Sequence, residues 1–246
     1  MIFRSTKRHG AFHLLLLHCL GATVCAQTDL RETKPLTFKG DLAERMLDGA
    51  HRFLDQKLAN ALARDKTVPG NREELARILG VTDKRLPFRA PSLVNATSQP
   101  AKVGSGPGYD VLTVRWPTLE GVFGEGLLLQ PMGRKPVADV VAIPDADQSP
   151  ESFVGLTPGT TPRGQFARRL AASGCRVVVP TLINRTIRGH SERRKRTQLS
   201  NREFLQRPAF LMGRTLQGLE IQKILALVDW FAREGSSSIG LVGWGE

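Results

Sequence analysis

The sequence predicts an α/β fold with an antiparallel edge pair of strands, then parallel strands, preceded by an N-terminal helical prefix. Two apolar runs, 111–116 and 126–130, are joined by a short Pro/Gly-containing turn, which is typical of neighbouring antiparallel strands. From residue 138 onward, nearly continuous apolar runs alternate with helical patterns, which indicates a parallel sheet covered on both faces. Residues 41–80 repeat apolar side chains at spacings of three and four, as amphipathic helices do.

The first 26 residues have the pattern of an export signal. Three basic residues, Arg4, Lys7 and Arg8, precede an apolar stretch over 11–24, and Val24-Cys25-Ala26 fits a signal-peptidase site before Gln27. A membrane anchor is the alternative, but the apolar stretch is short for a bilayer span. We therefore expect an exported protein, periplasmic or extracellular, with no stable membrane anchor after cleavage.

Composition fits a soluble globular chain with a basic surface. Of the 246 residues, 41% are hydrophobic and 24% charged, and the 35 Lys and Arg exceed the 23 Asp and Glu by 12. Cleavage after residue 26 would remove three positive charges and leave a net charge of +9. It would also leave Cys175 as the remaining cysteine, which excludes an internal disulfide and favours a core position at the start of a strand.

The helical prefix is expected over residues 27–87 and a linker over 88–108. The first helix starts at Asp41 and ends before Pro69-Gly70; Asn71 and Glu74 then form a capping-box-like pair for a second helix that ends at Gly80. The stretch 88–108 is rich in Pro, Ser and Gly. Its GSGPG sequence (104–108) is read as a turn rather than a phosphate loop, because no strand precedes it and no Lys-Ser/Thr follows.

The remaining elements follow in strict alternation. Strands are expected at 138–143, 176–182 and 239–242, separated by a short helix over 163–173 and a long helix from about Pro208 to Glu234. In the short helix Arg168 and Arg169 should point outward, and Phe166 and Leu170 inward. The last strand runs into Gly243-Trp244-Gly245-Glu246, a tight glycine turn that we call the elbow.

A family resemblance follows from these elements. The run NREFLQRPAFLMGRTLQGLEIQKILALVDWF followed by IGLVGWGE, together with VVAIPDADQSPE, resembles the bacterial acetyl-xylan-esterase and dienelactone-hydrolase-like branch of the α/β-hydrolases. The resemblance covers roughly residues 105–246. It implies an incomplete α/β-hydrolase-type sheet, with a truncated domain over 109–246 that ends at the elbow. It also implies a carboxylic-ester hydrolase as ancestor, with carbohydrate esters or other small acyl compounds as substrates and no cofactor.

The resemblance places Gly245 at the nucleophile position of the G-x-S-x-G elbow. Glycine has no side chain to attack an ester, so no catalytic residue is confirmed. The neighbouring Glu246 is a weak candidate, because a carboxylate can act as a nucleophile but this one is a residue late. The alternative is a structural role, because a negatively charged side chain in the first turn of a following helix interacts favourably with the helix dipole. Backbone N–H groups of Asp145 or Ala146, in the loop after the third strand of the family, are the oxyanion-hole candidates; an ordinary Asp-capped turn is the alternative.

No catalytic triad is visible. In this fold the histidine follows the nucleophile in the chain, whereas His51 and His190 both precede Gly245. His and Cys residues lack the spacing of metal ligands. The basic residues of the loop 185–196 could bind nucleic acid or an acidic polysaccharide, but the loop lacks aromatic residues for stacking. A solvated loop is favoured for it, and no nucleic-acid partner is expected.

Two hypotheses for the function remain. The first is a truncated or degenerate α/β-hydrolase that is catalytically inactive and at most binds a ligand. The second is an N-terminal fragment of an active or divergent exported esterase or lactone hydrolase. The residue at the elbow position, Gly245, favours the first.

Overall fold

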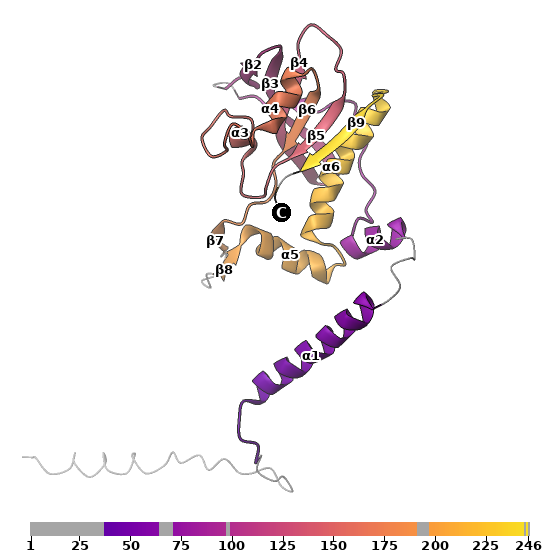
Figure 1. Cartoon of the computed structure of the whole chain (residues 1–246), viewed down its shortest axis with the longest axis vertical. Coiled ribbons are helices and arrows are strands. Elements are labelled where there is room, and N and C mark those ends of the chain that lie inside the picture. The colour runs from indigo at the N-terminus through magenta and orange to yellow at the C-terminus, as the bar shows by residue number, and fades with distance from the viewer. Residues whose placement is uncertain (1–36, 64–70, 97–98, 191–196, 244, 246) are drawn as a thin grey trace, which may run out of the picture. The chain divides into compact units, whose positions relative to one another are not determined.

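A computed structural model describes residues 37–63, 71–96, 99–190, 197–243 and 245, and of residues 188–190 and 197 the backbone alone. The chain divides into two units, residues 1–67 and 68–246, and each is described by itself (Figure 1). Among the described residues, none of the helices combines the length and the apolar character needed to cross a lipid bilayer.

The first unit contributes one long helix, α1 (Leu42–Leu62), as the sequence predicts. Its N-cap is Asp41, whose carboxylate accepts hydrogen bonds from the backbone N–H groups of Ala43 (2.7 Å) and Glu44 (3.4 Å). No residue of α1 is buried. Its apolar stripe is therefore open, with exposed Leu42, Met46, Leu47, Phe53, Leu54, Leu58 and Leu62.

The second unit begins with the short helix α2 (Arg72–Leu79), capped by Asn71 and ended by Gly80 in the left-handed conformation (φ +70°). The C-terminal end of α2 meets helix α6 (Leu216–Arg233) backbone to backbone. Thr215 Oγ1 donates to the Leu79 carbonyl over 2.7 Å. A Cβ at Gly218 would lie 3.1 Å from the Leu79 carbonyl carbon, and one at Gly80 would lie 2.6 Å from the Arg214 Cα. Both sides of this joint therefore require glycine.

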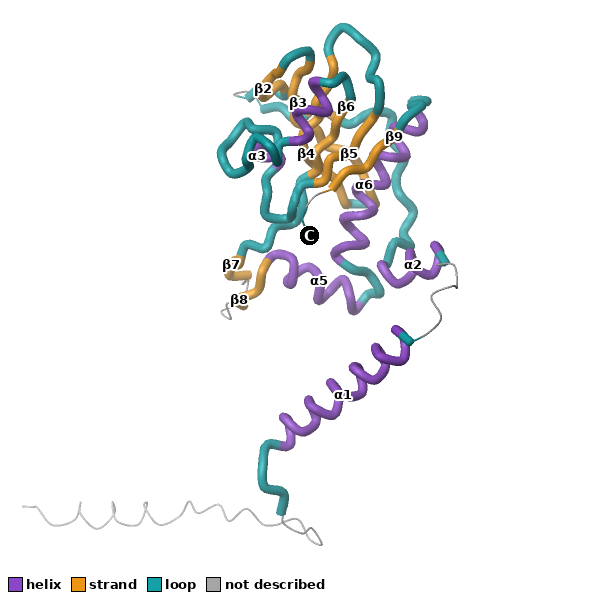
Figure 2. The backbone as a smooth tube through the Cα atoms, in the orientation of Figure 1, coloured by secondary structure: helices purple, strands orange, loops and turns teal. Residues whose placement is uncertain are grey.

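The sheet has the predicted α/β arrangement. Its strands run in the order β1-β3-β4-β6-β5-β9, with β2 paired to β3. The strands of this sheet lie together as the orange segments in the upper part of Figure 2. Pairs β3–β4 and β4–β6 are antiparallel, whereas β5 is parallel to both β6 and β9. The bounds are β1 Ser92–Leu93, β2 Lys102–Gly106, β3 Tyr109–Leu119, β4 Val122–Pro131, β5 Asp139–Ile143, β6 Arg176–Pro180 and β9 Ile239–Gly243.

Residues 88–108, expected to form a linker, thus include two strands of the sheet. Lys102 pairs with Leu112 and Gly106 with Tyr109, and the β2 strand covers part of the GSGPG stretch expected to be a turn. The turn itself is confined to Pro107 and Gly108, the latter at φ +80°. The many small residues in this segment hid the strand, because glycine is rare in strand interiors.

Helices cover both faces of the sheet. On one face, α3 (Pro150–Phe153) and α4 (Phe166–Ala172) pack on side chains of alternate strand positions such as Leu127, Leu129 and Val177. On the other face, α6 packs Leu227, Trp230 and Phe231 on Val114, Trp116, Leu128, Val141 and Val178. The indole N–H of Trp116 donates to the Lys223 carbonyl (3.1 Å), so this buried side chain has its hydrogen bond. Cys175 is buried beside the first of these clusters, as predicted.

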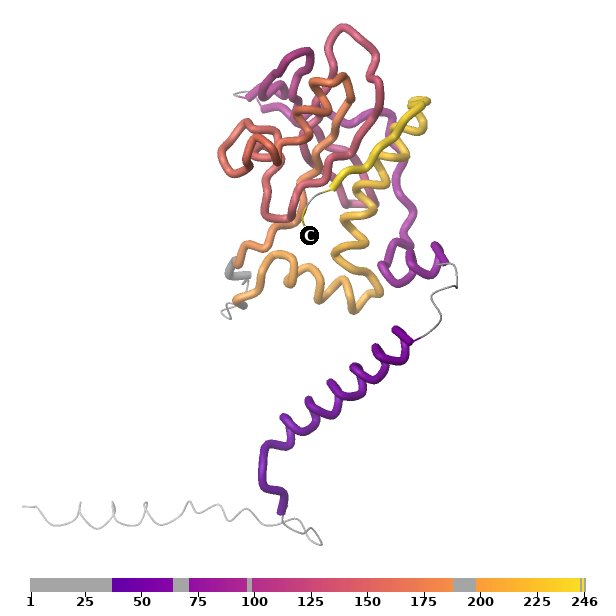
Figure 3. The backbone as a smooth tube through the Cα atoms, in the orientation of Figure 1, coloured from indigo at the N-terminus to yellow at the C-terminus, as the bar shows by residue number. Residues whose placement is uncertain are grey.

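The long helix expected from Pro208 to Glu234 is instead two helices, and this prediction is wrong. Helix α5 (Asn201–Leu211) ends before Gly213, whose φ is +68°, and α6 begins after the N-cap Thr215 (Figure 3). Pro208 lies inside α5 rather than at a helix start. A glycine in the left-handed conformation ends helices, and here it also lets α5 turn away from α6. Before α5, the strands β7 (Ile187–His190) and β8 (Thr197–Ser200) form a separate antiparallel pair.

One ionic network ties β5, β6 and α6 together. Arg176 donates from Nε to Asp139 Oδ1 (2.6 Å), from Nη2 to Asp139 Oδ2 (2.9 Å) and from Nη1 to Glu234 Oε2 (2.6 Å). Its guanidinium carbon lies 4.5 Å from the Trp230 ring centroid and 5.1 Å from that of Phe231. The side chains of Arg176 and Asp139 are 12% and 5% exposed. The network therefore fixes the N-terminal ends of both parallel strands to the end of α6.

Candidate functional site

The candidate site lies at the C-terminal ends of the parallel strands. Because β5, β6 and β9 run in the same direction, the loops that follow them meet at one edge of the sheet. In open α/β sheets this edge is where ligands bind. Here it is formed by residues 144–148 after β5, by residues 181–186 after β6 and by the elbow after β9.

Of the elbow, the structure describes Gly243 and Gly245, and at Gly245 there is no room for a side chain. Gly245 has φ +105°, a conformation that residues with a Cβ rarely adopt. A Cβ built there would lie 2.9 Å from the Asp145 Cβ and 3.1 Å from its Cγ, with the carboxylate nearer still. The Asp145 carboxyl group therefore fills the space that a nucleophile's side chain would occupy. Trp244 and Glu246 lie outside the described residues, so a role of Glu246 stays untested.

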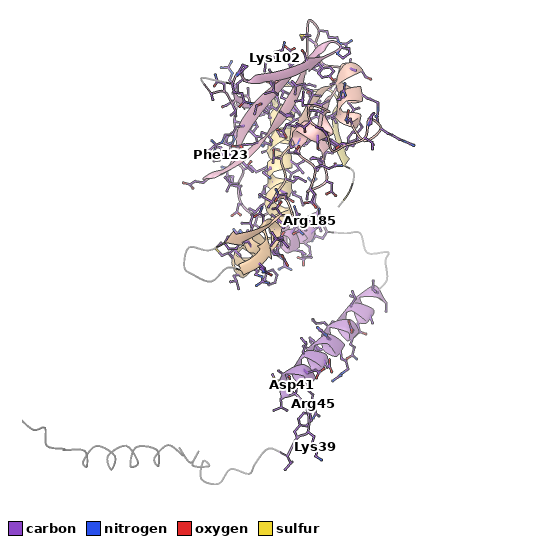
Figure 4. All side chains as sticks on the ribbon, turned by 90° about the vertical axis from the view of Figure 1, so that its left-hand side faces the viewer. Lys39, Asp41, Arg45, Lys102, Phe123 and Arg185 are labelled. Carbon is purple, nitrogen blue, oxygen red and sulfur yellow. The ribbon has the colours of Figure 1, made fainter. Side chains whose placement is uncertain are left out.

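Asp145 belongs to a small ionic cluster with Asp147 and Arg185. Arg185 Nη1 lies 3.1 Å from Asp145 Oδ1 and 3.0 Å from Asp147 Oδ2, and the Arg185 backbone N–H donates to Asp147 Oδ1 over 2.8 Å. The backbone N–H and then the guanidinium of Arg185 hold the pKa of Asp147 below its usual value. Figure 4 shows Arg185 between the sheet and the α5 region. One arginine thus ties the loop after β6 to the loop after β5.

The two oxyanion-hole candidates differ in their hydrogen bonds. The Asp145 N–H donates to Gln148 Oε1 at 3.3 Å, and its carboxylate accepts from the Asp147 N–H at 3.0 Å. Ala146 is buried, and its N–H makes no hydrogen bond to any described residue. The loop is thus a turn held by hydrogen bonds of Asp145, and the Ala146 N–H has no acceptor among the described residues. Whether either group binds an oxyanion stays a prediction.

A buried ionic group that sequence reasoning missed supports the loop after β6. Glu220 accepts from Arg202 (3.0 and 3.1 Å) and from the Ile183 backbone N–H (3.0 Å), and Lys223 Nζ donates to the Thr181 carbonyl (3.0 Å). Burial lowers the pKa of Lys223, while the nearby Glu220 carboxylate opposes that shift. The signal was present in the sequence, because two charged residues three apart interrupt the apolar face of α6.

The other residues singled out from the sequence lie away from this edge or outside the description. His51 is exposed on α1, and only the backbone of His190, in β7, is described. Of the basic loop 185–196, Arg185 is at the site, Ile187 to His190 form β7, and 191–196 lie outside the described residues. In the described ranges, no three or more His, Cys, Asp or Glu side chains are grouped to hold a metal ion.

Fold and site together define an α/β protein with a mixed sheet and a glycine, Gly245, in the turn that follows its last described strand. No protein-family model matches the sequence, and no curated protein is significantly similar to it. Solved structures that it resembles include a Bacteroides fragilis protein assigned as an acetyl xylan esterase (17% identity, TM-score 0.48, covering 71% of this chain and 45% of that chain). Others are a methylesterase (16%, 0.37, 70% and 33%) and a cold-adapted esterase from an Arctic intertidal metagenomic library (15%, 0.36, 56% and 52%). The chain thus spans about half or less of the length of these structures.

Proposed function

We propose that the chain carries an esterase-type α/β-hydrolase scaffold whose elbow does not supply a nucleophile. One observation carries this proposal: Gly245 has φ +105°, and the Asp145 carboxyl group occupies the space next to its Cα. Covalent ester hydrolysis at an elbow needs an oxygen or sulfur side chain there.

The resemblance of the α5–α6 and β9 sequences to acetyl-xylan-esterase-like proteins supports small esters or carbohydrate esters as the ligand class. In the proposed state the site binds such a compound without forming an acyl-enzyme. The free Ala146 N–H is the group that would donate to its carbonyl oxygen. The competing hypothesis, an active esterase, would need a carboxylate nucleophile from Asp145 or Glu246.

The test is hydrolysis of p-nitrophenyl acetate by the full chain. We expect the rate to equal that of buffer, without a burst of nitrophenol, for the parent and for Gly245→Ser. Gly235→Ser is the matched control, since Gly235 also has a positive φ (+76°) but faces open space. Turnover by the parent that falls at least tenfold in Asp145→Asn or Glu246→Gln would show a carboxylate nucleophile and overturn the proposal.

We also propose export through residues 1–26, on the basis of their basic and apolar segments and the Val24-Cys25-Ala26 sequence. Expression of the full chain in a bacterium, followed by fractionation and N-terminal sequencing, tests this. Export predicts a mature chain that starts at Gln27 outside the cytoplasm. An intact Met1 in the cytoplasmic fraction would contradict it.

A further inference from the structure

Four arginines line helix α4 and the residues on either side of it. Arg163 precedes the helix, Arg168 and Arg169 lie within it, and Arg134 reaches its C-terminal end, where a Cβ at Gly174 would lie 3.0 Å from the Arg134 Cζ. All four are exposed. We call this set the arginine row. With seven residues, α4 is about 10 Å long, so these arginines are distributed along the helix and beyond both of its ends.

The charges of the arginine row are not neutralised by carboxylates. Within the described part of the chain, none of the four guanidinium groups forms an ion pair. Arg169 Nη1 donates to the carbonyls of Pro162 (3.1 Å) and Arg163 (2.9 Å), and Arg168 Nη1 donates to Gln165 Oε1 (2.9 Å). These bonds orient two of the guanidinium groups but leave their charge uncompensated. Elsewhere in the second unit, Arg85, Arg115, Arg176, Arg185, Arg202 and Arg214 each pair with Asp or Glu, whereas Arg89 and Arg233 form no ion pair with a described residue.

Two adjoining pockets open onto the arginine row. One, of about 460 Å³, is lined by Thr161, Arg163, Phe166 and Arg169. The other, of about 230 Å³, is lined by Pro107, Pro162, Arg168, Arg169 and Tyr109. Arg169 is common to both pockets, while Arg163 and Arg168 each face one of them. The surface therefore offers hollows with apolar walls and a cation beside each.

This arrangement fits an extended polyanion better than a single small anion. A lone phosphate or carboxylate is bound by donors that converge on one point, whereas these guanidinium groups are spread along α4 and over two pockets. It also fits a saccharide better than a nucleic acid. Single strands are bound by exposed aromatic rings that stack on bases. Here Tyr109 is buried, and Phe166 packs edge-on against Phe153 at a centroid distance of 4.7 Å.

We propose that the arginine row and its two pockets bind an acidic polysaccharide, with guanidinium groups pairing with successive carboxylate or sulfate groups and sugar rings lying in the hollows. The two anionic groups share one recognition chemistry, since guanidinium pairs with either through parallel N–H···O bonds. The full chain carries a net charge of +12, of which the four arginines of the row account for 4; attraction to the remaining 12 − 4 = +8 would add to the binding, and salt would weaken it.

Binding of the full-length protein to polygalacturonate and to heparin tests the proposal, with neutral dextran and single-stranded DNA as comparisons. We expect the parent to bind at least one of the two acidic polysaccharides, and the one bound more tightly identifies the anionic group. The double variant Arg163→Gln/Arg168→Gln should bind it roughly tenfold more weakly, which is about 1.4 kcal/mol. The variant's thermal unfolding should match that of the parent, because both side chains are exposed.

The matched control is Arg89→Gln/Arg115→Gln, which removes the same charge from exposed arginines outside the row. It should bind within twofold of the parent. Failure of the parent to bind either polysaccharide would overturn the proposal. So would an equal loss in the control, which would mean that net charge alone attracts the polymer. DNA binding as tight as polysaccharide binding, and equally sensitive to the Arg163→Gln/Arg168→Gln change, would assign the surface to nucleic acid instead.

Discussion

Replacing Arg176 by methionine should destabilise the second unit more than any exposed arginine replacement. Methionine approximates the length of the side chain and keeps its contact with Trp230, but it removes the cation. Asp139, whose side chain is 5% exposed, then keeps a buried charge without its partner. Removing one member of a buried ion pair costs about 3–5 kcal/mol, mostly because the remaining charge is left unpaired.

The other contacts of Arg176 change this figure little. The Glu234 side chain is 38% exposed, so its ion pair adds at most about 1 kcal/mol. Loss of the cation–π contacts with Trp230 and Phe231 adds about 0.5–2 kcal/mol, part of which the methionine restores by packing. The unpaired Asp139 therefore decides the outcome. For a domain of this size, 3–5 kcal/mol corresponds to a fall in melting temperature of about 6–20 °C.

Urea unfolding followed by far-UV circular dichroism measures the effect. Arg115→Met is the control, because Arg115 and Glu125 are 47% and 60% exposed and their pair should contribute less than about 1 kcal/mol. The double variant Arg176→Met/Asp139→Asn should recover much of the loss, since it removes the buried charge. A loss below about 1 kcal/mol for Arg176→Met, or no recovery in the double variant, would refute the reasoning.

Two further predictions concern the joint of α2 and an ion pair near it. The Gly218→Ala variant should gain about 1 kcal/mol from helix propensity. It also forces a Cβ against the Leu79 carbonyl, and such overpacking costs about 1–3 kcal/mol, so chemical unfolding should show a net loss of stability. Gly49→Ala in α1, with nothing within 4 Å, should only raise helicity; a gain in stability from both variants would exclude the clash. The hydrogen bonds from Arg214 lower the pKa of Asp83 in the folded state. This pair therefore stabilises the fold fully at pH values above the pKa of Asp in the unfolded chain, about 3.9, and loses that effect as the pH falls through the lower pKa of the folded state. In thermal melts Asp83→Asn should be less stable than the parent at pH 7, by at most about 1 kcal/mol. The difference should vanish once the pH lies below the lowered pKa of Asp83 in the folded state, and a constant difference would argue against a role of its ionisation.

Local chemistry made most of the fold predictable. Asp41, Asn71 and Gly80 mark helix ends by side-chain acceptors and by a left-handed backbone, and these signals need only neighbouring residues. Apolar runs likewise located β5, β6 and β9. The missed boundary between α5 and α6 lies at Gly213. In the sequence this glycine stands within an otherwise continuous helical pattern, and only its φ of +68° shows that the helix ends there.

The strand ends that form this edge were predictable, but the contacts between the loops that follow them were not. The sequence placed Gly245 and the Asp145 loop at one edge, because both follow strands of the same parallel sheet. It did not show that the Asp145 side chain fills the space at Gly245, since the two residues are a hundred positions apart. Arg185 was interpreted as part of a solvated loop, although it pairs with Asp145 and Asp147 some forty positions away. Contacts of this kind depend on how separate loops meet, and periodicity carries no information about that.

The joint between α2 and α6 has a consequence for how the sequence can diverge. At this point α2 is held by its own peptide groups, the Leu79 carbonyl and the backbone at Gly80, rather than by interlocking side chains. None of the residues of α2 is buried. The outward side chains of the helix are thus free to drift over evolutionary time, while Gly80 and Gly218 must be retained together. Distant relatives should keep this pair of glycines in register long after the rest of α2 has lost any detectable similarity.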